Sequence, residues 1–433
     1  MKAILLAAGE GLRLRPLTET TPKPLLKVLG VPILKRTIDT LNKFGIKDFV
    51  IITNYLEEQI KTYIKETLSD LSIEFVHQTE IKGTANALLL AKSKIDEKFL
   101  IAVNGDCIYS DSLIKRTVEA AQQGIISVGG KFTEEISKYG VILTDENHIP
   151  IKMIEKPSSD ELKEGYANIG IYSFSKEIFD IIEDMEKNNV VSPRGEYEIP
   201  DAVNNLLESR KYNSQLIKLQ EDDFWFDIGR PWNLLDANER LLSFCSDERV
   251  GTIEDGVTLK GVVVIKKGSI IRSGVYIEGP VFIDEGADIG PNCYIRKYSY
   301  LGKRSRIGNG CEIKNSIIEE NTHAAHLSYI GDSIIGPNCN FGAGTITANL
   351  RLDKKTIPVK IKGNKENSKR KKLGVIVGER VETGIGALLM PGIKVGSDSW
   401  IGAGTIVDED IPSESIYFGT QKYTLRRKRK NAN

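Results

Sequence analysis

The chain has 433 residues, which is too long for one hydrophobic core and favours two or three domains. Its 59 Lys and Arg residues balance 59 Asp and Glu residues, so overall charge favours neither a nucleic acid nor a membrane as partner. No apolar run suits a signal peptide or a membrane span, and the five scattered cysteines include no CxxC pair. We therefore expect a cytoplasmic protein that binds neither nucleic acid nor membrane.

The first half of the chain alternates between apolar strands and amphipathic helices. Strands are predicted at residues 2–7, 49–53, 75–76 and 99–103, and helices at residues 32–44, 55–68 and 84–94. This alternation is typical of a Rossmann-like α/β domain, in which helices cover both faces of a mostly parallel sheet. Ligands bind such sheets at the carboxyl ends of the strands.

A loop of small residues follows the first predicted strand. It contains Ala8, Gly9 and Gly11 and continues through Arg13 to the Pro-Lys-Pro that is centred on Lys23. Small residues let backbone N–H groups approach phosphates closely, and the two cations can neutralise a triphosphate. The loop is neither a P-loop nor a dinucleotide fingerprint, and a solvated surface charge is the alternative role for Arg13 taken alone.

Asp106 directly follows the apolar strand at residues 99–103. A carboxylate at this position is either a helix N-cap or a metal ligand. Because it faces a phosphate-binding loop, we favour Mg²⁺, which prefers one or two carboxylates together with phosphate oxygens. A second acidic ligand is then expected.

Residues 1 to about 240 resemble the sugar-1-phosphate nucleotidylyltransferases, through the glycine loop and the Pro-Lys-Pro together. Residues 224–229 look like that family's aromatic-x-Asp-x-Gly motif, which makes Asp227 the expected metal partner of Asp106. By residue type alone, Asp227 is a turn former. The resemblance implies further contacts: Gln78, Gly83 and Thr84 to the pyrimidine base, and Gly140, Glu155, Lys156 and Asn168 to the sugar phosphate. Ordinary turn residues and solvated ion pairs are the alternative for each. The motif at residues 196–200 also fits, without an assigned role.

The implied reaction requires little covalent chemistry from the protein. A phosphate oxygen of a sugar 1-phosphate attacks the α-phosphorus of UTP or dTTP, and pyrophosphate leaves. No side-chain nucleophile is needed, so Arg13, Lys23 and the metal would act by stabilising the charge of the transition state.

Aliphatic residues recur every sixth position in the second half. A period of six fits neither a helix nor a plain strand, and it is typical of a left-handed parallel β-helix built from hexapeptide repeats. The uninterrupted series is Ile253, Leu259, Ile265, Ile271, Ile277, Ile283, Ile289, Ile295, Leu301, Ile307 and Ile313. A helix is predicted at residues 231–245 before it. We therefore expect domains at residues 1–245 and 246–425, followed by a basic tail at residues 426–433.

The segment around His326 resembles the acetyltransferase half of the bifunctional N-acetylglucosamine-1-phosphate uridyltransferases, and the later repeats are closer to the archaeal-type enzymes. The resemblance makes His326 the general base that deprotonates the amine of glucosamine 1-phosphate, a role for which imidazole titrates in the right range. A single His is otherwise more often structural or solvated. The implied substrate contacts are Arg296, Lys314, Tyr329, Asn340, Asn349 and Lys355, and the implied acetyl-CoA contacts are Ala343 and Ala403.

Two departures from that family affect the coenzyme site. Ile385 stands where the family has a small hydroxyl residue, and the basic segment at residues 353–373 is longer than one repeat. We interpret this segment as a loop outside the repeats, either over the coenzyme's phosphates or simply solvated.

Three functions fit these features. The first is a bifunctional enzyme, assembled as a homotrimer, that uses Mg²⁺ and takes UTP or dTTP, sugar 1-phosphates and acetyl-CoA. The second is a nucleotidylyltransferase whose β-helix serves only for oligomerisation. The third is a regulatory partner without activity, which the presence of Arg13, Lys23 and Asp106 disfavours.

Overall fold

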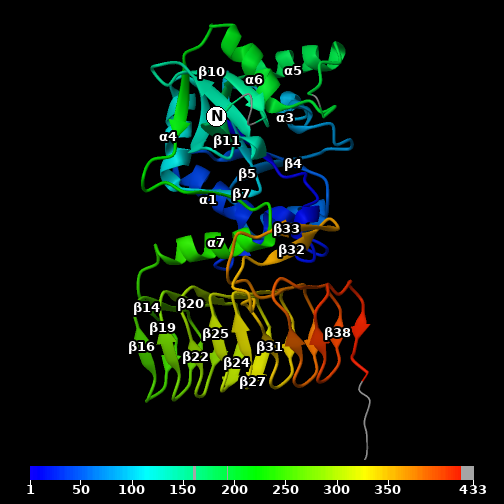
Figure 1. Ribbon diagram of the computed structural model, residues 1–433. Helices are drawn as coiled ribbons and strands as arrows, with labels where there is room; N and C mark the ends of the chain where they lie inside the picture. Colours follow the sequence, from blue (N-terminus) through cyan, green and yellow to red (C-terminus); the bar gives the residue numbers. More distant parts are fainter. Residues whose placement is uncertain (159–161, 193, 421–433) are drawn as a thin grey trace, which may run out of the picture. The chain divides into compact units, whose positions relative to one another are not determined.

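The computed structural model describes residues 1–158, 162–192 and 194–420 (Figure 1). The chain divides into two compact units, one with Met1–Leu14 and Thr20–Ala237, the other with Arg15–Glu19 and the chain from Asn238 onward. The basic tail predicted at residues 426–433 lies outside the described residues. Within the described ranges, no helix combines the length and the apolar character needed to cross a membrane.

A mixed β-sheet is the centre of the first unit. Its main strand order is β10-β9-β11-β6-β1-β4-β5, and β8 joins β11 to β12. The bounds are β1 Lys2–Leu6, β4 Asp48–Thr53, β5 Ser72–His77, β6 Phe99–Asn104, β8 Ile126–Thr133, β9 Gly140–Thr144, β10 Pro150–Glu155, β11 Gly165–Ser175 and β12 Ser214–Lys218. The strands β6, β1, β4 and β5 are parallel, as predicted.

The other half of the sheet departs from the mostly parallel arrangement predicted. The strands β9 and β10 pair antiparallel, and β11 runs antiparallel to β6, β8 and β9. Short connections such as the one between β9 and β10 can join only antiparallel strands, whereas parallel strands need a crossover helix. The sequence after residue 124 offers few such crossovers.

Helices cover both faces of this sheet. Alternating strand residues belong to two separate cores: Ile4, Val50 and Leu100 pack with α3, α5 and α6, whereas Leu5, Ile51 and Ile101 pack with α1, α2 and α4. The bounds are α1 Ile33–Lys43, α2 Glu57–Thr67, α3 Thr84–Leu89, α4 Asp111–Gln122, α5 Ile178–Lys187, α6 Ile199–Glu208 and α7 Pro231–Leu242. The helix predicted at residues 84–94 is shorter, because it ends at Leu89 and a 3₁₀ turn follows at Lys92–Lys94.

The second unit is a prism of three parallel β-sheets, the predicted left-handed parallel β-helix. The first face contains β14 Glu248–Arg249, β17 Val263–Ile265, β20 Val281–Ile283, β23 Ser299–Leu301, β26 Ile317–Ile318, β29 Ile334–Ile335, β34 Ile376–Val377 and β37 Lys394–Val395. The second face contains β15 Thr252–Ile253, β18 Ile270–Ile271, β21 Asp288–Ile289, β24 Arg306–Asn309, β27 His323–His326, β30 Asn340–Phe341, β35 Glu382–Thr383, β38 Trp400–Ile401 and β40 Ile416–Tyr417. The third face contains β16 Thr258–Lys260, β19 Tyr276–Glu278, β22 Tyr294–Ile295, β25 Glu312–Lys314, β28 Tyr329–Gly331, β31 Ile346–Thr347, β36 Leu388–Leu389 and β39 Ile406–Val407.

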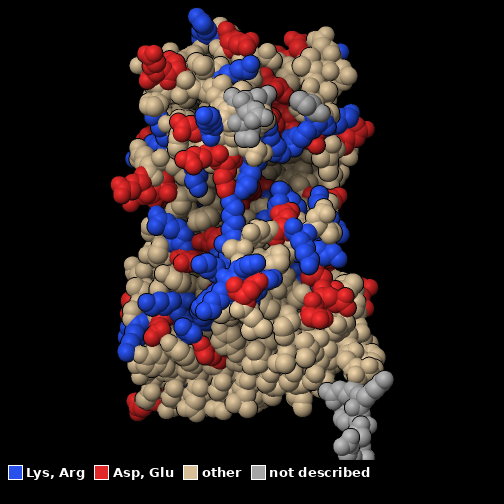
Figure 2. All heavy atoms as spheres, in the orientation of Figure 1, with Lys and Arg blue, Asp and Glu red and all other residues tan. Residues whose placement is uncertain are grey.

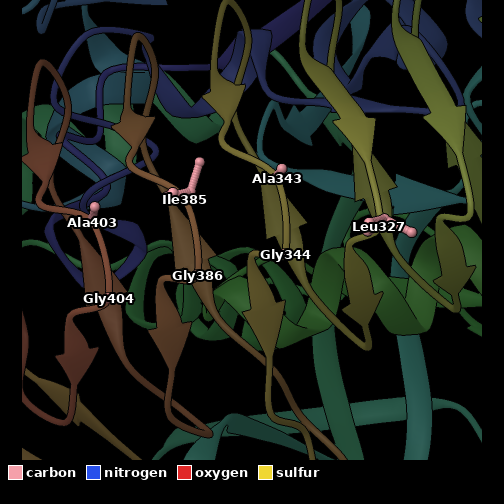
Figure 3. A pocket seen from close by; sticks show the side chains of 7 residues that line it. All are labelled: Leu327, Ala343, Gly344, Ile385, Gly386, Ala403 and Gly404. Atoms are coloured by element: carbon pink, nitrogen blue, oxygen red, sulfur yellow. The ribbon is translucent and has the colours of Figure 1, made fainter.

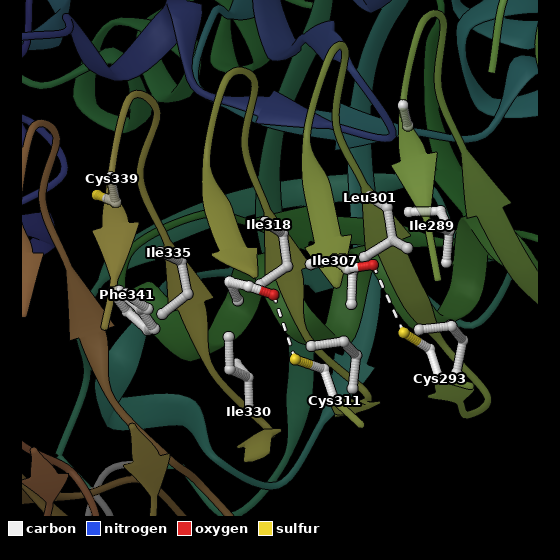
Figure 4. Close-up of a cluster of buried hydrophobic side chains, with 14 of the residues drawn as sticks. Ile289, Cys293, Leu301, Ile307, Cys311, Ile318, Ile330, Ile335, Cys339 and Phe341 are labelled. Atoms are coloured by element: carbon white, nitrogen blue, oxygen red, sulfur yellow. Dashed lines mark hydrogen bonds between the residues drawn. The ribbon is translucent and has the colours of Figure 1, made fainter. Parts of the chain in front are cut away.

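The aliphatic series fills the interior of the prism (Figure 4). From Ile265 to Ile313 every member is buried, and the thiols of Cys293, Cys311 and Cys339 complete the core between them. Cys311 Sγ lies 3.2 Å from the carbonyl oxygen of Ala324 in the next coil. Ile253 differs from the prediction, since it is 37% exposed. It lies in the first strand of the second face, where no earlier coil can cover it.

A hairpin projects from the prism between Asn349 and Gly374. It consists of the antiparallel strands β32 Pro358–Ile361 and β33 Asn364–Asn367. The isolated bridge between Leu350 and Lys372 closes its base. Residues 351–372 include ten Lys or Arg residues and two acidic ones, and Lys and Arg side chains gather on the surface near β32 and β33 (Figure 2). The predicted excursion is therefore an ordered, basic hairpin.

Candidate functional site

The carboxyl ends of the parallel strands bring the predicted nucleotide residues to one edge of the first sheet. The glycine loop follows β1, Gln78 follows β5, and Asp106 follows β6. Gly11 has a φ of +67° and accepts a hydrogen bond from Leu14 N, so it starts a 3₁₀ turn that carries Arg13. Parallel topology therefore explains why residues far apart in sequence share this edge.

A short antiparallel ribbon positions the second carboxylate. The strands β7 Cys107–Tyr109 and β13 Trp225–Asp227 pair with Asp227 opposite Cys107, so Asp227 lies next to Asp106. The ammonium of Lys23 is 2.5 Å from Asp106 Oδ2 and 3.9 Å from Asp227 Oδ1. One cation thus lies within 4 Å of both carboxylates. Burial raises the pKa of Asp227, and the neighbouring Asp106 charge adds to this effect.

A cleft of about 320 Å³ opens beside these carboxylates. The predicted residues that line it are Arg13, Thr84, Asp106, Gly140, Glu155, Lys156, Asn168 and Asp227. Gly140 lies opposite Glu155, and a Cβ at Gly140 would come 2.8 Å from Glu155 Oε2, so a larger residue there would displace that carboxylate. Asn168 donates a 2.6 Å hydrogen bond to the Tyr172 hydroxyl.

Other predicted residues lie outside the lining of this cleft. Gln78 is 3% exposed, and its side-chain amide donates to Asn86 Oδ1 at 3.2 Å. Gly83 has a φ of +116°, and a Cβ there would come 2.3 Å from the Tyr197 carbonyl oxygen. Gly9 has open space around it, with no heavy atom within 4 Å of a Cβ placed there.

The cleft also contains polar residues to which the sequence analysis gave no role. Arg194 donates hydrogen bonds to Glu155, at 3.1 Å, and to Glu198. Glu198 is only 4% exposed, and burial raises the pKa of its carboxyl group against the opposing charge of Arg194. The motif at residues 196–200 was a signal for Glu198, whereas Arg194 lies in an irregular segment with no comparable signal. Tyr172 and Trp225 also line the cleft.

The prism brings a second set of predicted residues to the corner between its second and third faces, here called the second corner. His326 ends β27 and is exposed there. A groove of about 550 Å³ runs along this corner over successive coils (Figure 3). Its lining includes the predicted Ala343 and Ala403, together with Leu327, Gly344, Ile385, Gly386 and Gly404. The side chain of Ile385, where the family has a small hydroxyl residue, projects from the groove and is 65% exposed.

The predicted sugar-phosphate residues lie at the corner between the third and first faces, the third corner. Lys314 donates a 2.7 Å hydrogen bond to Asp332, and Asn349 donates to Asp332 at 2.5 Å and to the Tyr329 hydroxyl at 3.0 Å. Asp332 is 2% exposed and was not predicted. Arg296, also at the third corner, pairs with Glu312 at 2.8 Å.

Two more predicted substrate residues lie apart from this cluster. Asn340 is on the second face, in register with His323. Lys355 lies in the basic hairpin, shortly before β32, where its backbone N–H donates to Asp353 at 3.2 Å. One chain therefore divides the predicted acetyltransferase residues between different parts of the prism.

Comparisons with known proteins agree with this two-part organisation. Residues 2–243 match the Nucleotidyl transferase family, and residues 277–388 match the GMPPB C-terminal domain family. The Bifunctional protein GlmU of Methanocaldococcus jannaschii is 42% identical over 427 residues, which cover 99% of this chain and 100% of the relative. A Bifunctional sugar-1-phosphate nucleotidylyltransferase/acetyltransferase of Sulfurisphaera tokodaii is 38% identical over 95% of this chain and 98% of its own length.

A shorter relative matches the first unit alone. The UTP--glucose-1-phosphate uridylyltransferase AglF of Haloferax volcanii is 34% identical over 244 residues, which are 56% of this chain and 96% of that protein. The matches above, by contrast, run through both units at 38% identity or more. The chain therefore belongs to the family of bifunctional sugar-1-phosphate nucleotidylyltransferase/acetyltransferases.

Proposed function

We propose that the two units catalyse two reactions of nucleotide-sugar synthesis. The domain predicted at residues 1–245 joins UTP or dTTP to a sugar 1-phosphate, such as N-acetylglucosamine 1-phosphate or glucose 1-phosphate, and releases pyrophosphate. The domain predicted at residues 246–425 transfers the acetyl group of acetyl-CoA to the amine of glucosamine 1-phosphate, or of galactosamine 1-phosphate.

The observation that carries the proposed nucleotidyl transfer is a pair of carboxylates that both lie close to the ammonium group of Lys23. Asp106 directly precedes β7, Asp227 ends the paired strand β13, and both carboxylates are within 4 Å of Lys23 Nζ. Two carboxylates fit Mg²⁺, which completes its coordination with phosphate oxygens and water. Among the described residues, no group of three or more His, Cys, Asp or Glu side chains could hold a metal. When bound, the ion would neutralise charge on the triphosphate.

The chain's own side chains would orient the two phosphates and stabilise charge. Arg13 lines the cleft next to the carboxylates, where its guanidinium can contact the α-phosphate. At the other end of the cleft, Glu155 and Lys156 are available to the sugar hydroxyls and the sugar phosphate. The sugar phosphate oxygen forms the new P–O bond as pyrophosphate departs, so no residue is covalently modified.

His326 carries the proposed acetyl transfer. It is exposed at the end of β27, next to the groove that Ala343 and Ala403 line. The amine nitrogen attacks the thioester carbonyl while His326 accepts the amine proton. The C–S bond then breaks, and the coenzyme leaves as a thiol with a proton returned to sulfur.

The separation of the two corners supports a homotrimer as part of this proposal. Phosphate and amine are on neighbouring carbons of the aminosugar, so the phosphate contacts and the base must lie close together. Within one prism, however, Leu327 precedes β28 and Gly331 ends it, so these two residues are four residue steps, or roughly 13 Å, apart. We propose that the third corner of one subunit faces the second corner of the next.

Two single substitutions test the division of labour. Arg13→Ala should lower pyrophosphate release by about 10²–10³-fold in kcat and leave coenzyme A release intact. His326→Ala should do the reverse. Each variant is thus the folding control for the other, and a panel of sugar phosphates against UTP and dTTP identifies the preferred substrates.

The alternative is a nucleotidylyltransferase whose prism serves only for assembly, and the match to AglF over the first unit alone favours testing it. Under this alternative the wild-type enzyme releases no coenzyme A from acetyl-CoA with any aminosugar 1-phosphate. Unchanged pyrophosphate release in Arg13→Ala would show that Arg13 has no role in nucleotidyl transfer.

A further inference from the structure

The second corner of the prism consists of residues in the left-handed backbone region. At this corner, among the described coils, the residues with positive φ are Gly256, Gly274, Gly290, Asn292, Gly310, Leu327, Gly344, Gly386 and Gly404. Glycine and asparagine adopt this conformation readily, whereas a leucine is strained there. Leu327, with a φ of +48°, is the exception in this series.

Burial does not compensate for this strain. Leu327 is 63% exposed, so its side chain adds little to the core. Strained residues that packing does not require are concentrated at functional sites. Leu327 also directly follows His326 in the chain, at the end of β27.

The side chain of Leu327 closes one end of the groove. Figure 3 shows Ala403, Ile385, Ala343 and Leu327 at the corners of successive coils. Beyond Leu327, the next coil presents Gly310, and a Cβ placed on Gly310 would come 2.7 Å from Leu327 Cδ2. Leu327 therefore folds over a glycine, and without it the groove would continue across Gly310.

We infer that Leu327 determines the length of the acyl chain that the enzyme transfers. This inference rests on the proposed acetyl transfer. The thioester must lie within reach of His326, and the rest of the coenzyme follows the groove towards Ala403. The acyl group then points at Leu327, which leaves space for acetyl and excludes longer chains. One further coil would add about 4.8 Å, which accommodates a few more methylene groups.

The test compares acyl-CoA thioesters of different length on the full-length enzyme. Coenzyme A release with glucosamine 1-phosphate is measured for acetyl-, butanoyl- and hexanoyl-CoA. In Leu327→Gly, the ratio of kcat/KM for butanoyl-CoA to that for acetyl-CoA should rise by about tenfold or more, since a methylene in an apolar pocket changes selectivity by about 10–200-fold. Leu327→Asn, which places the residue type of Asn292 at this corner, should have a smaller effect in the same direction.

Two controls separate selectivity from general damage. Ile385→Ala removes the other large side chain of the groove, away from His326, and should affect all three thioesters alike. Leu352→Gly changes a fully exposed leucine outside the groove and should leave the selectivity ratio at its wild-type value. The melting temperature of Leu327→Gly should be unchanged or higher, because glycine relieves the left-handed strain.

The outcomes distinguish the two levels of the proposal. Active Leu327→Gly and Leu327→Asn enzymes that keep the wild-type selectivity ratio would overturn the role of Leu327 and leave acetyl transfer standing. A markedly lower melting temperature in Leu327→Gly would show that the leucine stabilises the fold, and would also overturn its role in acyl-chain selectivity. A wild-type enzyme that releases no coenzyme A from any thioester would overturn the acetyltransferase function, and the inference with it.

Discussion

Lys23 and Asp106 form a partly buried ion pair beside the nucleotidyltransferase cleft, with Lys23 Nζ 2.5 Å from Asp106 Oδ2. Burial by itself lowers the pKa of Lys23, but the charges of Asp106 and Asp227 more than reverse this effect, so the pKa lies above its usual value. The lysine is therefore a permanent cation beside both proposed metal ligands.

This ion pair predicts that Lys23→Met binds a divalent cation more tightly than the wild type. Removing the ammonium leaves two carboxylates without the cation that now neutralises them. Pyrophosphate release should nevertheless fall by about 10²–10³-fold, because the transition state loses a stabilising charge. Mn²⁺ titration followed by electron paramagnetic resonance, without nucleotide, measures the affinity. Lys115→Met on α4 is the control, and weaker Mn²⁺ binding in Lys23→Met would contradict the prediction.

Asp223 holds the segment that leads into β13 and Asp227. Its side chain is 2% exposed and accepts hydrogen bonds from Ser110 Oγ at 2.6 Å, from Gln220 N at 2.8 Å and from Arg116. Asp223→Asn should lower the free energy of unfolding of the first unit by about 3 kcal/mol at pH 7, because Arg116 loses its charged partner. Pyrophosphate release should fall, whereas coenzyme A release should not change.

The difference in the free energy of unfolding between the wild type and Asp223→Asn should depend on pH in a definite direction. Burial raises the pKa of Asp223, but the hydrogen bonds from Ser110, Ser112 and Gln220 outweigh it and hold the pKa below its usual value. The stabilisation is thus complete above the unfolded-state pKa of about 3.9 and is lost as the pH falls through the lower folded-state value. Urea unfolding should therefore show the gap between wild type and Asp223→Asn closing below about pH 4. A gap that widens on acidification would exclude this account, and Glu221→Gln is the control.

Asp332 joins three polar side chains at the third corner. Its carboxylate accepts hydrogen bonds from Lys314 at 2.7 Å, Asn315 at 3.0 Å and Asn349 at 2.5 Å. Asp332→Asn should raise the KM for the aminosugar phosphate by about tenfold or more, because hydrogen bonds to a charged group are worth about 1.5–3 kcal/mol. The kcat should change less, since His326 is at another corner.

A matched variant tests whether this effect is local. Asp284 is also a buried carboxylate of the prism, 6% exposed, and accepts a 2.8 Å hydrogen bond from the Tyr300 hydroxyl. Asp284→Asn should lower the melting temperature without raising that KM. Equal KM values for wild type and Asp332→Asn would leave Asp332 a purely structural residue.

The aliphatic interior predicts a large stability effect at Ile295. This residue is fully buried between Ile277 and Ile313 of the adjacent coils. Ile295→Ala should cost about 2–5 kcal/mol in the free energy of unfolding. Ile406→Ala, at a 57% exposed position on the same face, should stay within about 0.5 kcal/mol. Denaturant unfolding followed by circular dichroism compares the two, and similar costs would contradict the assignment of inside and outside.

The period of six predicted the prism because each repeat places one aliphatic side chain inside. It could not predict the start of the prism, since β14 at Glu248–Arg249 pairs with β17 without an aliphatic of the series. The parallel half of the first sheet followed from strand and helix alternation. Its antiparallel half depends on short connections, whose partners no periodicity specifies.

The residues of the proposed sites also divide into those that a sequence pattern predicts and those that only the folded structure brings together. Asp106 was predictable because it follows an apolar strand, and Asp227 because it lies in a recognisable motif. Asp332 carried an unused signal, since it directly follows Gly331, the residue that pairs with Lys314 in the adjacent coil, and its carboxylate therefore lies within reach of Lys314. Arg194 belongs to neither kind of pattern, and only the folded cleft brings it to Glu155 and Glu198.

The hairpin between Asn349 and Gly374 has a practical consequence. The strands β29 and β34 pair in register, Ile334 with Ile376 and Ile335 with Val377, although the whole hairpin lies between them in sequence. Its tip at Lys362–Gly363 is exposed and already turns through left-handed conformations. Because loop closure becomes only slowly more costly with length, this tip can accept a fluorescent reporter or an affinity tag while the coils on either side keep their pairing. The enzyme thus carries a ready attachment point for labelling within its catalytic scaffold.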